Sequence, residues 1–219
     1  MKILILQEIR MSDLRKTLIL AVLGFSSGCS ISYYSPAMPS SNSYYRNPAK
    51  NISSLGKVAL IELQNNSPYP QISEDVTEMV FQQMQKKQVF GLKTVQADSP
   101  EWKNLQIPPE GPENISQLAA IRKTLNCNAI IIGTVTEYQP YPHLSIGLRL
   151  KMIDLTDGQL IWGFEQIWDS ADKSTQQKIT KYLKQQKKGQ SQNLDQQLIS
   201  LSSIEFLKFV TYEMTRCCK

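Results

Sequence analysis

The sequence is poor in the side chains from which catalytic sites are usually built. It has a single histidine, His143, among 219 residues, and its four cysteines show no metal-binding spacing such as C-x₂-C. No serine stands in a G-x-S-x-G turn, and no glycine-rich phosphate loop is present. His143 lies beside a proline in PYPHL, a context more typical of a turn than of a general base. We therefore predict a protein that is not an enzyme, with no catalytic residues, no metal and no cofactor.

A strong charge of one sign is also missing. The formal net charge is +5 at pH 7, and about +3 remains without the first 28 residues. Domains that bind nucleic acid usually have a pI above about 9 and a clustered basic face. We therefore predict no nucleic-acid partner.

No apolar run approaches the roughly 20 residues that cross a bilayer. The run TLILAVLGF, residues 17–25, follows Arg15 and Lys16 and leads into the small residues Ser26, Ser27 and Gly28. A positive start, a short apolar core and a small-residue exit are typical of a secretory signal peptide. We predict that residues 1–28 are such a signal, with Met11 as a second possible start.

The end of this signal resembles a bacterial lipoprotein box, with Ser27 and Gly28 before Cys29 and with Ser26 where that family usually has Leu. The resemblance implies that Cys29 receives a diacylglyceryl group and becomes the mature amino terminus. Two or three acyl chains at one cysteine anchor a protein stably. Ser30, in place of Asp, implies the outer membrane, facing the periplasm. The alternative is an ordinary signal peptide that is cut nearby and releases a secreted protein.

Residues 30–55 are rich in Ser, Tyr, Asn and Pro and have no strand or helix periodicity. Such a composition predicts a flexible tether, so we assign residues 29–55 to the lipidated cysteine and its tether, and residues 56–219 to a single domain. Cys127 precedes an apolar run, where a small buried hydrophobe is expected. Whether Cys127, Cys217 and Cys218 form disulfides stays open.

The remaining chain alternates strand and helix signals. Apolar or alternating residues predict strands, and an apolar stripe between polar faces predicts helices, with Ser73 as the first N-cap. A hairpin around DLTDGQ joins two alternating runs between Leu144 and Trp168. The expected order is β-α-β-α-β-β-β with C-terminal helices, an α/β fold with a mixed sheet; its signals lie at residues 57–63, 73–90, 90–96, 115–126, 127–139, 144–152 and 160–169. We expect Gly133 to let a helix approach the sheet closely.

Part of this succession resembles a known periplasmic domain. The phrases LNCNAIIIGTVTEY and KMIDLTDGQLIW, with Gly133, Asp154, Gly158 and Trp162, are similar to the α/β domain shared by three groups. These are the penicillin-binding-protein activator lipoproteins, the curli-secretion lipoproteins and the amino-terminal domain of the Tol-system β-propeller protein. The resemblance covers residues 56–169, with Asn126 and Cys127 in place of the usual Gly-Ala or Gly-Cys pair. It specifies fold better than function.

The resemblance implies an envelope lipoprotein whose domain binds another envelope protein or assembly. The alternative is an oligomeric secretion or pore-forming subunit like the curli-secretion family, which leaves a homo-oligomer possible. Such a subunit needs extra alternating segments of about 9–11 residues, whereas the only strong alternating pair here belongs to the predicted core. We therefore favour the interaction module.

Two further interpretations concern surfaces. Aromatic residues on loops provide contact area at low entropic cost, so Trp102, Tyr138, Tyr141 and His143 are the candidate partner-binding residues. For Trp102 the alternative is that it folds back onto its own domain. The Lys/Gln-rich stretch from Lys173 to Lys188 is expected to be a solvated helix face, with contact to anionic headgroups or peptidoglycan as the alternative.

Overall fold

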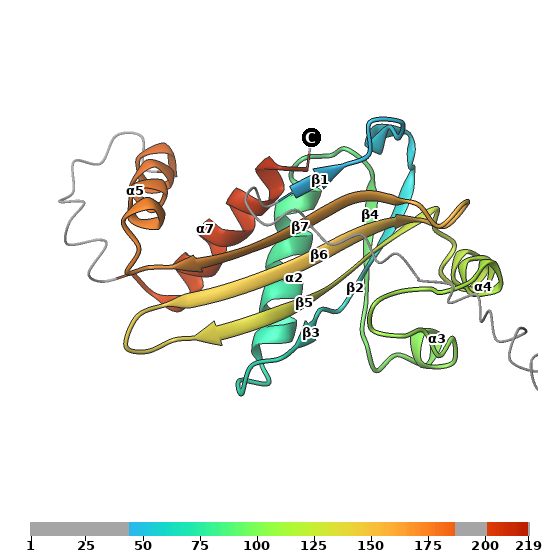
Figure 1. Ribbon diagram of the computed structural model, residues 1–219, viewed down its shortest axis with the longest axis horizontal. Coiled ribbons are helices and arrows are strands. Elements are labelled where there is room, and N and C mark those ends of the chain that lie inside the picture. Colours follow the sequence, from blue (N-terminus) through green and yellow to red (C-terminus); the bar gives the residue numbers. More distant parts are fainter. Residues whose placement is uncertain (1–43, 187–200, 219) are drawn as a thin grey trace, which may run out of the picture. The chain divides into compact units, whose positions relative to one another are not determined.

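A mixed β-sheet with helices on both faces forms the framework of the protein (Figure 1). The computed structural model describes residues 44–186 and 201–218. Cys29 and residues 30–43 of the predicted tether lie outside the described residues. The elements are β1 (Tyr44–Arg46), the 3₁₀-helix η1 (Ile52–Ser54), β2 (Lys57–Ile61), β3 (Gln64–Asn65), α2 (Ile72–Gln85), β4 (Gly91–Val95), α3 (Pro100–Lys103), α4 (Ile115–Leu125), β5 (Ala129–Gln139), β6 (Ser145–Asp154), β7 (Leu160–Asp169), α5 (Lys173–Gln186) and α7 (Ser203–Arg216).

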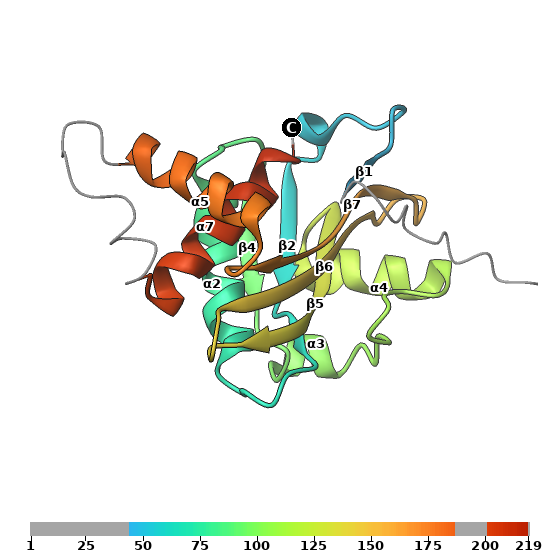
Figure 2. The same ribbon diagram turned by 60° about the vertical axis from the view of Figure 1, so that its left-hand side comes forward.

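The strand order is β1-β7-β6-β5-β2-β4, and β3 also pairs with β5. β2 pairs in parallel with both β4 and β5, whereas β5, β6, β7 and β1 pair antiparallel. The predicted α/β fold with a mixed sheet is confirmed. The two crossover helices, α2 and α4, lie on opposite faces of the sheet (Figure 2).

The larger core lies on the face covered by α2, α5 and α7. Val58 and Leu60 of β2 pack there with Val76 and Val80 of α2. Trp162, Phe164 and Trp168, two residues or four apart on β7, are fully buried and form a stack with ring centroids 5.8 and 5.6 Å apart. Strand alternation places all three aromatic rings on this face.

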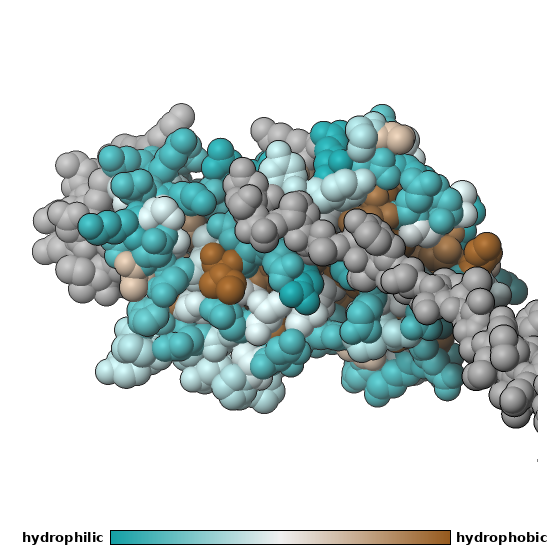
Figure 3. Space-filling model, in the orientation of Figure 1, coloured by the Kyte–Doolittle hydropathy of each residue, from teal (hydrophilic) through white to brown (hydrophobic). Residues whose placement is uncertain are grey.

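The second core is smaller and lies between the opposite face and α4. Ala59, Ile130 and Ile132 pack there against Leu118 and Ile121 of α4. Beyond α4, the same face of β6 and β7 is partly open and carries Arg149, Lys151, Glu165 and the exposed Ile167. Figure 3 shows mostly hydrophilic side chains over these strands.

The N-cap of the first α-helix lies two residues before the predicted one. Gln71 is the N-cap of α2, and Ser73 lies inside the helix. Its Oγ donates to the carbonyl oxygen of Leu63 and to Oε1 of Glu62, because this turn packs directly on the chain that leaves β2. At the end of α4, Asn126 takes the left-handed conformation, with φ of 46°. Asparagine tolerates this conformation better than most residues, which explains how Asn126 can stand where the resembled families have glycine.

Residues 44–55 belong to the folded domain, which corrects the predicted boundary. β1 pairs with β7, with Tyr44 opposite Phe164 and Tyr45 opposite Gly163. Ile52 and Leu55 are 1% and 7% exposed and pack in the larger core. The predicted tether therefore loses residues 44–55, because β7 would otherwise present an unpaired edge and the core would lack two apolar side chains.

Gly133 has a different role from the one predicted. A Cβ atom at this position would lie 2.3 Å from the carbonyl oxygen of Arg149 and 2.7 Å from Cδ2 of Leu150. Both residues belong to the neighbouring strand β6, so Gly133 permits close approach of a strand and not of a helix. Gly158 has φ of +73° in the β6–β7 turn, as its turn context predicts.

Among the helices of residues 44–186 and 201–218, none combines the length and the apolar character that a membrane crossing requires.

Candidate interaction surfaces

The predicted contact residues separate into two places. Tyr138, Tyr141 and His143 lie at the β5–β6 hairpin end, far from α3 (Figure 1). Tyr141 is 82% exposed. His143 Nε2 lies 3.2 Å from Asp169 Oδ2. Tyr138 lies on β5 and not on a loop, and its half-buried ring packs edge-on against Tyr69 at 5.4 Å.

Trp102 lies in the short helix α3, within the proline-rich loop. Its half-buried ring packs against the smaller core together with Leu105 and Ile107. This is the arrangement in which Trp102 folds back onto its own domain. The structure therefore groups the three hairpin residues and leaves Trp102 apart from them.

The two aspartates of the DLTDGQ turn have structural partners. Asp154 Oδ1 accepts the N–H of Thr156, and Asp157 Oδ1 accepts the N–H of Gln159. These are the turn-capping bonds expected of aspartate at such positions. Lys50 joins the two carboxylates, with Nζ 2.8 Å from Asp154 Oδ2 and 2.5 Å from Asp157 Oδ2. The DLTDGQ turn, which is part of the family resemblance, thus has a structural role here.

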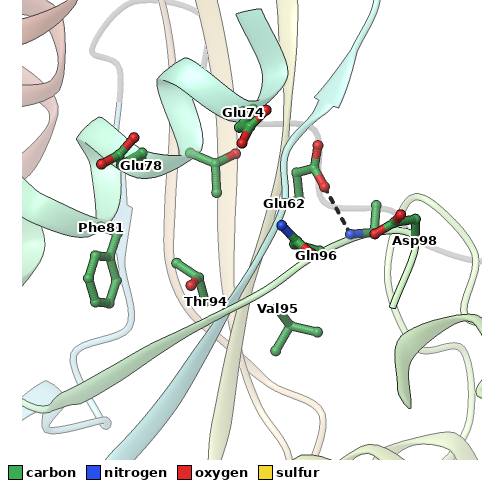
Figure 4. A pocket seen from close by; sticks show the side chains of 10 residues that line it. Glu62, Glu74, Glu78, Phe81, Thr94, Val95, Gln96 and Asp98 are labelled. Carbon is green, nitrogen blue, oxygen red and sulfur yellow. Dashed lines mark hydrogen bonds between the residues drawn. The ribbon is translucent and has the colours of Figure 1, made fainter. Parts of the chain in front are cut away.

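A groove that the sequence analysis did not anticipate lies between α2 and β4 (Figure 4). We call it the α2–β4 groove; its volume is about 610 Å³. The lining residues are Glu62, Glu74, Thr77, Glu78, Phe81, Thr94, Val95, Gln96, Ala97 and Asp98. Four of them are acidic and none is basic.

Three segments bring these side chains together. Glu62 directly follows β2, and residues 96–98 directly follow β4, so both reach the same edge because the two strands are parallel. Thr77, Glu78 and Phe81 lie three, four and seven residues after Glu74, so all four share one side of α2. The only signal visible in the sequence is this spacing of Glu74 and Glu78, and the helix dipole accounts for Glu74 alone, because Glu78 lies beyond the first turn.

Hydrogen bonds fix the floor of the groove. Glu62 accepts the N–H of Ala97 at Oε2, 3.0 Å away, and the Ser73 hydroxyl at Oε1, 3.2 Å away. The buried Thr77 hydroxyl accepts the N–H of Leu63 at 3.0 Å and donates to the carbonyl oxygen of Ser73 at 2.7 Å. The carboxylate of Glu62 is therefore held in place before any partner arrives.

A second depression, of about 510 Å³, lies between α2, α5 and α7. Lys86, Lys87 and Lys208 line it together with the rings of Tyr182 and Tyr212. Along α5, Ile179, Tyr182 and Leu183 are buried, as the apolar stripe predicts, and the lysines face outward. Lys187 and Lys188 of the predicted lysine-rich face lie outside the described residues.

The thiols of the described residues are poorly suited to nucleophilic chemistry. Burial raises the pKa of Cys127, of Cys217 and of Cys218, for the last to about 11. A thiol whose pKa lies far above neutrality carries little of the reactive thiolate. Across residues 44–186 and 201–218, no three His, Cys, Asp or Glu side chains are grouped so that they could hold a metal ion.

These features define a mixed α/β domain whose described surface offers grooves and exposed edges for contact. No family model matches the sequence, and no curated protein matches it. Among solved structures, it is similar to the PelC dodecamer from Paraburkholderia phytofirmans, at 13% identity and a TM-score of 0.42 over 76% of this chain and 94% of that one.

Two further solved structures are similar to this chain. The C-terminal domain of LpoB from Salmonella enterica is 16% identical with a TM-score of 0.38, over 52% of this chain and 83% of that one. Lipoprotein GNA1162 from Neisseria meningitidis is 11% identical with a TM-score of 0.38, over 63% and 99%. These values are too low to transfer a function to this chain.

Proposed function

We propose that this protein is a lipid-anchored component of a bacterial envelope whose domain binds another envelope protein and catalyses no reaction. The observation that carries the proposal is the α2–β4 groove, which is open, rigidly floored and next to the last strand of the sheet. Its lining combines carboxylates with the apolar ring of Phe81. Concave surfaces of this kind, with a few fixed polar groups, are typical binding sites.

The envelope location rests on the residues before the domain. Arg15 and Lys16, the apolar run and the small residues ahead of Cys29 form the pattern of a lipoprotein signal. A lipid on Cys29 holds the domain at a membrane surface through residues 29–43. This tether is shorter than the sequence predicts, because residues 44–55 pack on the sheet.

The non-catalytic part of the proposal is supported by the duties of the reactive side chains. Asp154 and Asp157 cap a turn and bind Lys50. His143 pairs with Asp169 at an exposed hairpin end. Each of these groups is committed to a local contact, and none lies among the lining residues of the α2–β4 groove.

The location is tested by mass spectrometry of the purified protein and by a Cys29→Ser variant. We expect an acylated amino-terminal peptide that begins at Cys29, and loss of membrane association in the variant. Cys217→Ser is the matched control and should fractionate as the unchanged protein does. An unmodified amino terminus, or membrane association that survives Cys29→Ser, contradicts the anchor.

Partner binding is tested by crosslinking in intact envelopes, affinity capture and identification of the captured proteins. We expect one reproducible envelope partner. A Tyr141→Ala, His143→Ala double variant tests whether the hairpin end takes part in the contact. Recovery of rings of this chain alone would replace the proposal with the oligomeric secretion subunit.

A further inference from the structure

Strand β4 ends the sheet, and its outer side has no partner strand within residues 44–186 and 201–218. Its backbone bonds to β2 include Gly91 N–H to Gly56 O at 2.7 Å and Glu62 N–H to Val95 O at 2.8 Å. Alternate residues of a strand direct their backbone groups to opposite sides. Leu92 and Thr94 therefore turn their N–H and C=O groups away from β2, toward the outer side of the sheet. Such an edge is a template for another strand.

The side chains of β4 leave this edge accessible. Most of β4 is exposed, whereas β2 beside it is almost fully buried. Lys93, the type of residue that often blocks a sheet edge, stands in register with Ala59, whose side chain belongs to the core under α4. Its side chain is therefore on the α4 face and does not cover the α2–β4 groove.

The α2–β4 groove lies where the side chains of an added strand would point. Thr94 faces it from β4 and Gln96 from the residue after β4 (Figure 4), and Thr77 and Phe81 line it from α2. A strand that pairs with Leu92 and Thr94 continues the sheet outward, and every second side chain on it points toward α2. Main-chain bonds to an edge then give affinity, and the adjoining groove selects side chains.

The charge of the groove indicates what those side chains are. Glu62, Glu74, Glu78 and Asp98 line it, and none of them takes part in an ion pair among the described residues. Glu74 and Glu78, four residues apart on a helix, repel one another. A lysine or arginine between them relieves that repulsion.

The chain's own amino-terminal segment does not match this charge. Residues 30–43 contain no Lys, Arg, Asp or Glu. A separate basic segment is the better complement.

We propose that the β4 edge and the α2–β4 groove together bind an extended basic segment of a partner protein, which adds to β4 as a further strand and places Lys or Arg side chains among these carboxylates. The proposal deepens the proposed function and rests on it for the idea of a protein partner.

The test uses the full chain in detergent and fluorescent ten-residue peptides. One peptide alternates Lys with Val, a second alternates Glu with Val, and a third carries Pro in place of two Val residues. We expect saturable binding of the Lys peptide, none of the Glu peptide and at least tenfold weaker binding of the Pro peptide, which cannot complete a ladder. Hydrogen exchange at Leu92 and Thr94 should slow when the Lys peptide binds.

Two variants separate charge from backbone pairing. Glu74→Gln, Glu78→Gln should weaken binding of the Lys peptide at least tenfold, whereas the matched control Glu101→Gln, Glu110→Gln, outside the groove, should not. Thr94→Pro removes an N–H that faces away from β2 and should also abolish binding. If Thr94→Pro fails to fold, the glutamate pair and the exchange data still decide.

Three results overturn the inference. They are equal binding of the Glu peptide, binding that leaves exchange at Leu92 and Thr94 unchanged, and protection of these amides without peptide that disappears when residues 30–43 are deleted. The last result would mean that the chain's own segment occupies the edge. If an envelope partner crosslinks to a different surface of the domain, this inference fails and the proposed function stands. If the protein binds the Lys peptide but is not located in the envelope, the inference stands and the proposed function fails.

Discussion

Lys50 donates a hydrogen bond to Asp154 over 2.8 Å, although the two residues lie on segments that are distant in the chain. Lys50 stands between β1 and η1, and Asp154 ends β6 at the hairpin turn. The side chain of Asp154 is 11% exposed and that of Lys50 is 21% exposed. The bond therefore ties the amino-terminal segment to the turn that carries the family resemblance.

Lys50→Met should make stability less dependent on pH. Hydrogen bonds to Asp154 and Asp157 raise the pKa of Lys50. Burial alone would raise the pKa of Asp154, but hydrogen bonds from Lys50 and Thr156 outweigh it and lower that pKa.

The directions of the two pKa shifts determine the pH range in which the ion pair stabilises the fold. Asp154 has a lowered pKa in the folded state, so its contribution is present above its ordinary pKa of about 3.9 and is lost as the pH falls through the folded value. Lys50 has a raised pKa, so its contribution is present below about pH 10.4 and is lost as the pH rises further. Urea unfolding should show the largest deficit of the variant between about pH 5 and 9 and a smaller one at pH 3. The exposed Lys103→Met is the control, and a deficit of equal size at pH 3 and 7 would contradict the assignment.

Gly133→Ala should destabilise the domain by about 1–3 kcal/mol, the usual cost of overpacking. The added methyl group would meet the backbone of β6, which cannot move without disturbing the sheet. Gly91→Ala is the control, since its Cβ would have no neighbour nearer than the Gly56 carbonyl oxygen at 3.4 Å. Thermal or urea unfolding of both variants decides, and equal stability would refute the close approach of β5 and β6.

Trp162→Phe should cost about 1 kcal/mol more than Trp168→Phe. Both rings are fully buried, so the lost apolar volume is alike. Trp162 Nε1 donates to the carbonyl oxygen of Cys217 at 3.2 Å, whereas Trp168 Nε1 has no hydrogen-bond partner among the described residues. Removing the Trp162 donor leaves the Cys217 carbonyl oxygen without that hydrogen bond, which destabilises the fold. Removing the Trp168 donor takes away a buried N–H that had no partner among the described residues, which is favourable. Urea unfolding measures the difference, and the reverse order would be incompatible with these contacts.

Ile52→Ala should lower the free energy of unfolding by about 2–5 kcal/mol, as for other large-to-small changes in a core. Ile52 is 1% exposed, whereas Ile115, the control, is 82% exposed. Ile115→Ala should change stability by no more than about 0.5 kcal/mol. Equal effects of the two substitutions would restore the original domain boundary at Gly56.

Cys218 should react slowly with iodoacetamide at pH 8. Burial raises its pKa to about 11, so only about a thousandth of the thiol is ionised. In a Cys217→Ser variant, alkylation of Cys218 followed by peptide mapping should be at least tenfold slower in the native protein than in urea. Native and unfolded rates that coincide would exclude this environment.

The long strands and α4 can be predicted because their local patterns and their tertiary contacts agree. Residues 144–152 alternate strictly, and β6 buries one side of that alternation. At the start of α2 the local pattern and the tertiary contacts disagree. Ser73 fits the local pattern of an N-cap, but its hydroxyl donates to the chain that follows β2 and does not cap the helix. The start of β1 has no periodicity, since Tyr44 and Tyr45 remain exposed and the strand depends on β7 for its pairing.

The exposure of the predicted contact residues could be predicted only in part. Tyr141 is exposed, as an aromatic residue in a turn suggests, but the burial of one side of Trp102 depends on a core assembled from distant segments. The α2–β4 groove has no linear motif at all. Glu62, Glu78 and Asp98 become neighbours only when two parallel strands and the helix between them are in place.

The strand order also leads us to expect a particular order of strand pairing during folding. β5, β6 and β7 pair with partners that are adjacent along the chain, so only short loops must close. Val58 must find Ala129, and Tyr44 must find Phe164, across most of the domain. Because closing a longer loop costs more entropy, we expect the β5–β6–β7 meander to form early and β1 to pair late. On this expectation the segment next to the proposed anchor becomes fixed only after the chain up to β7 is complete.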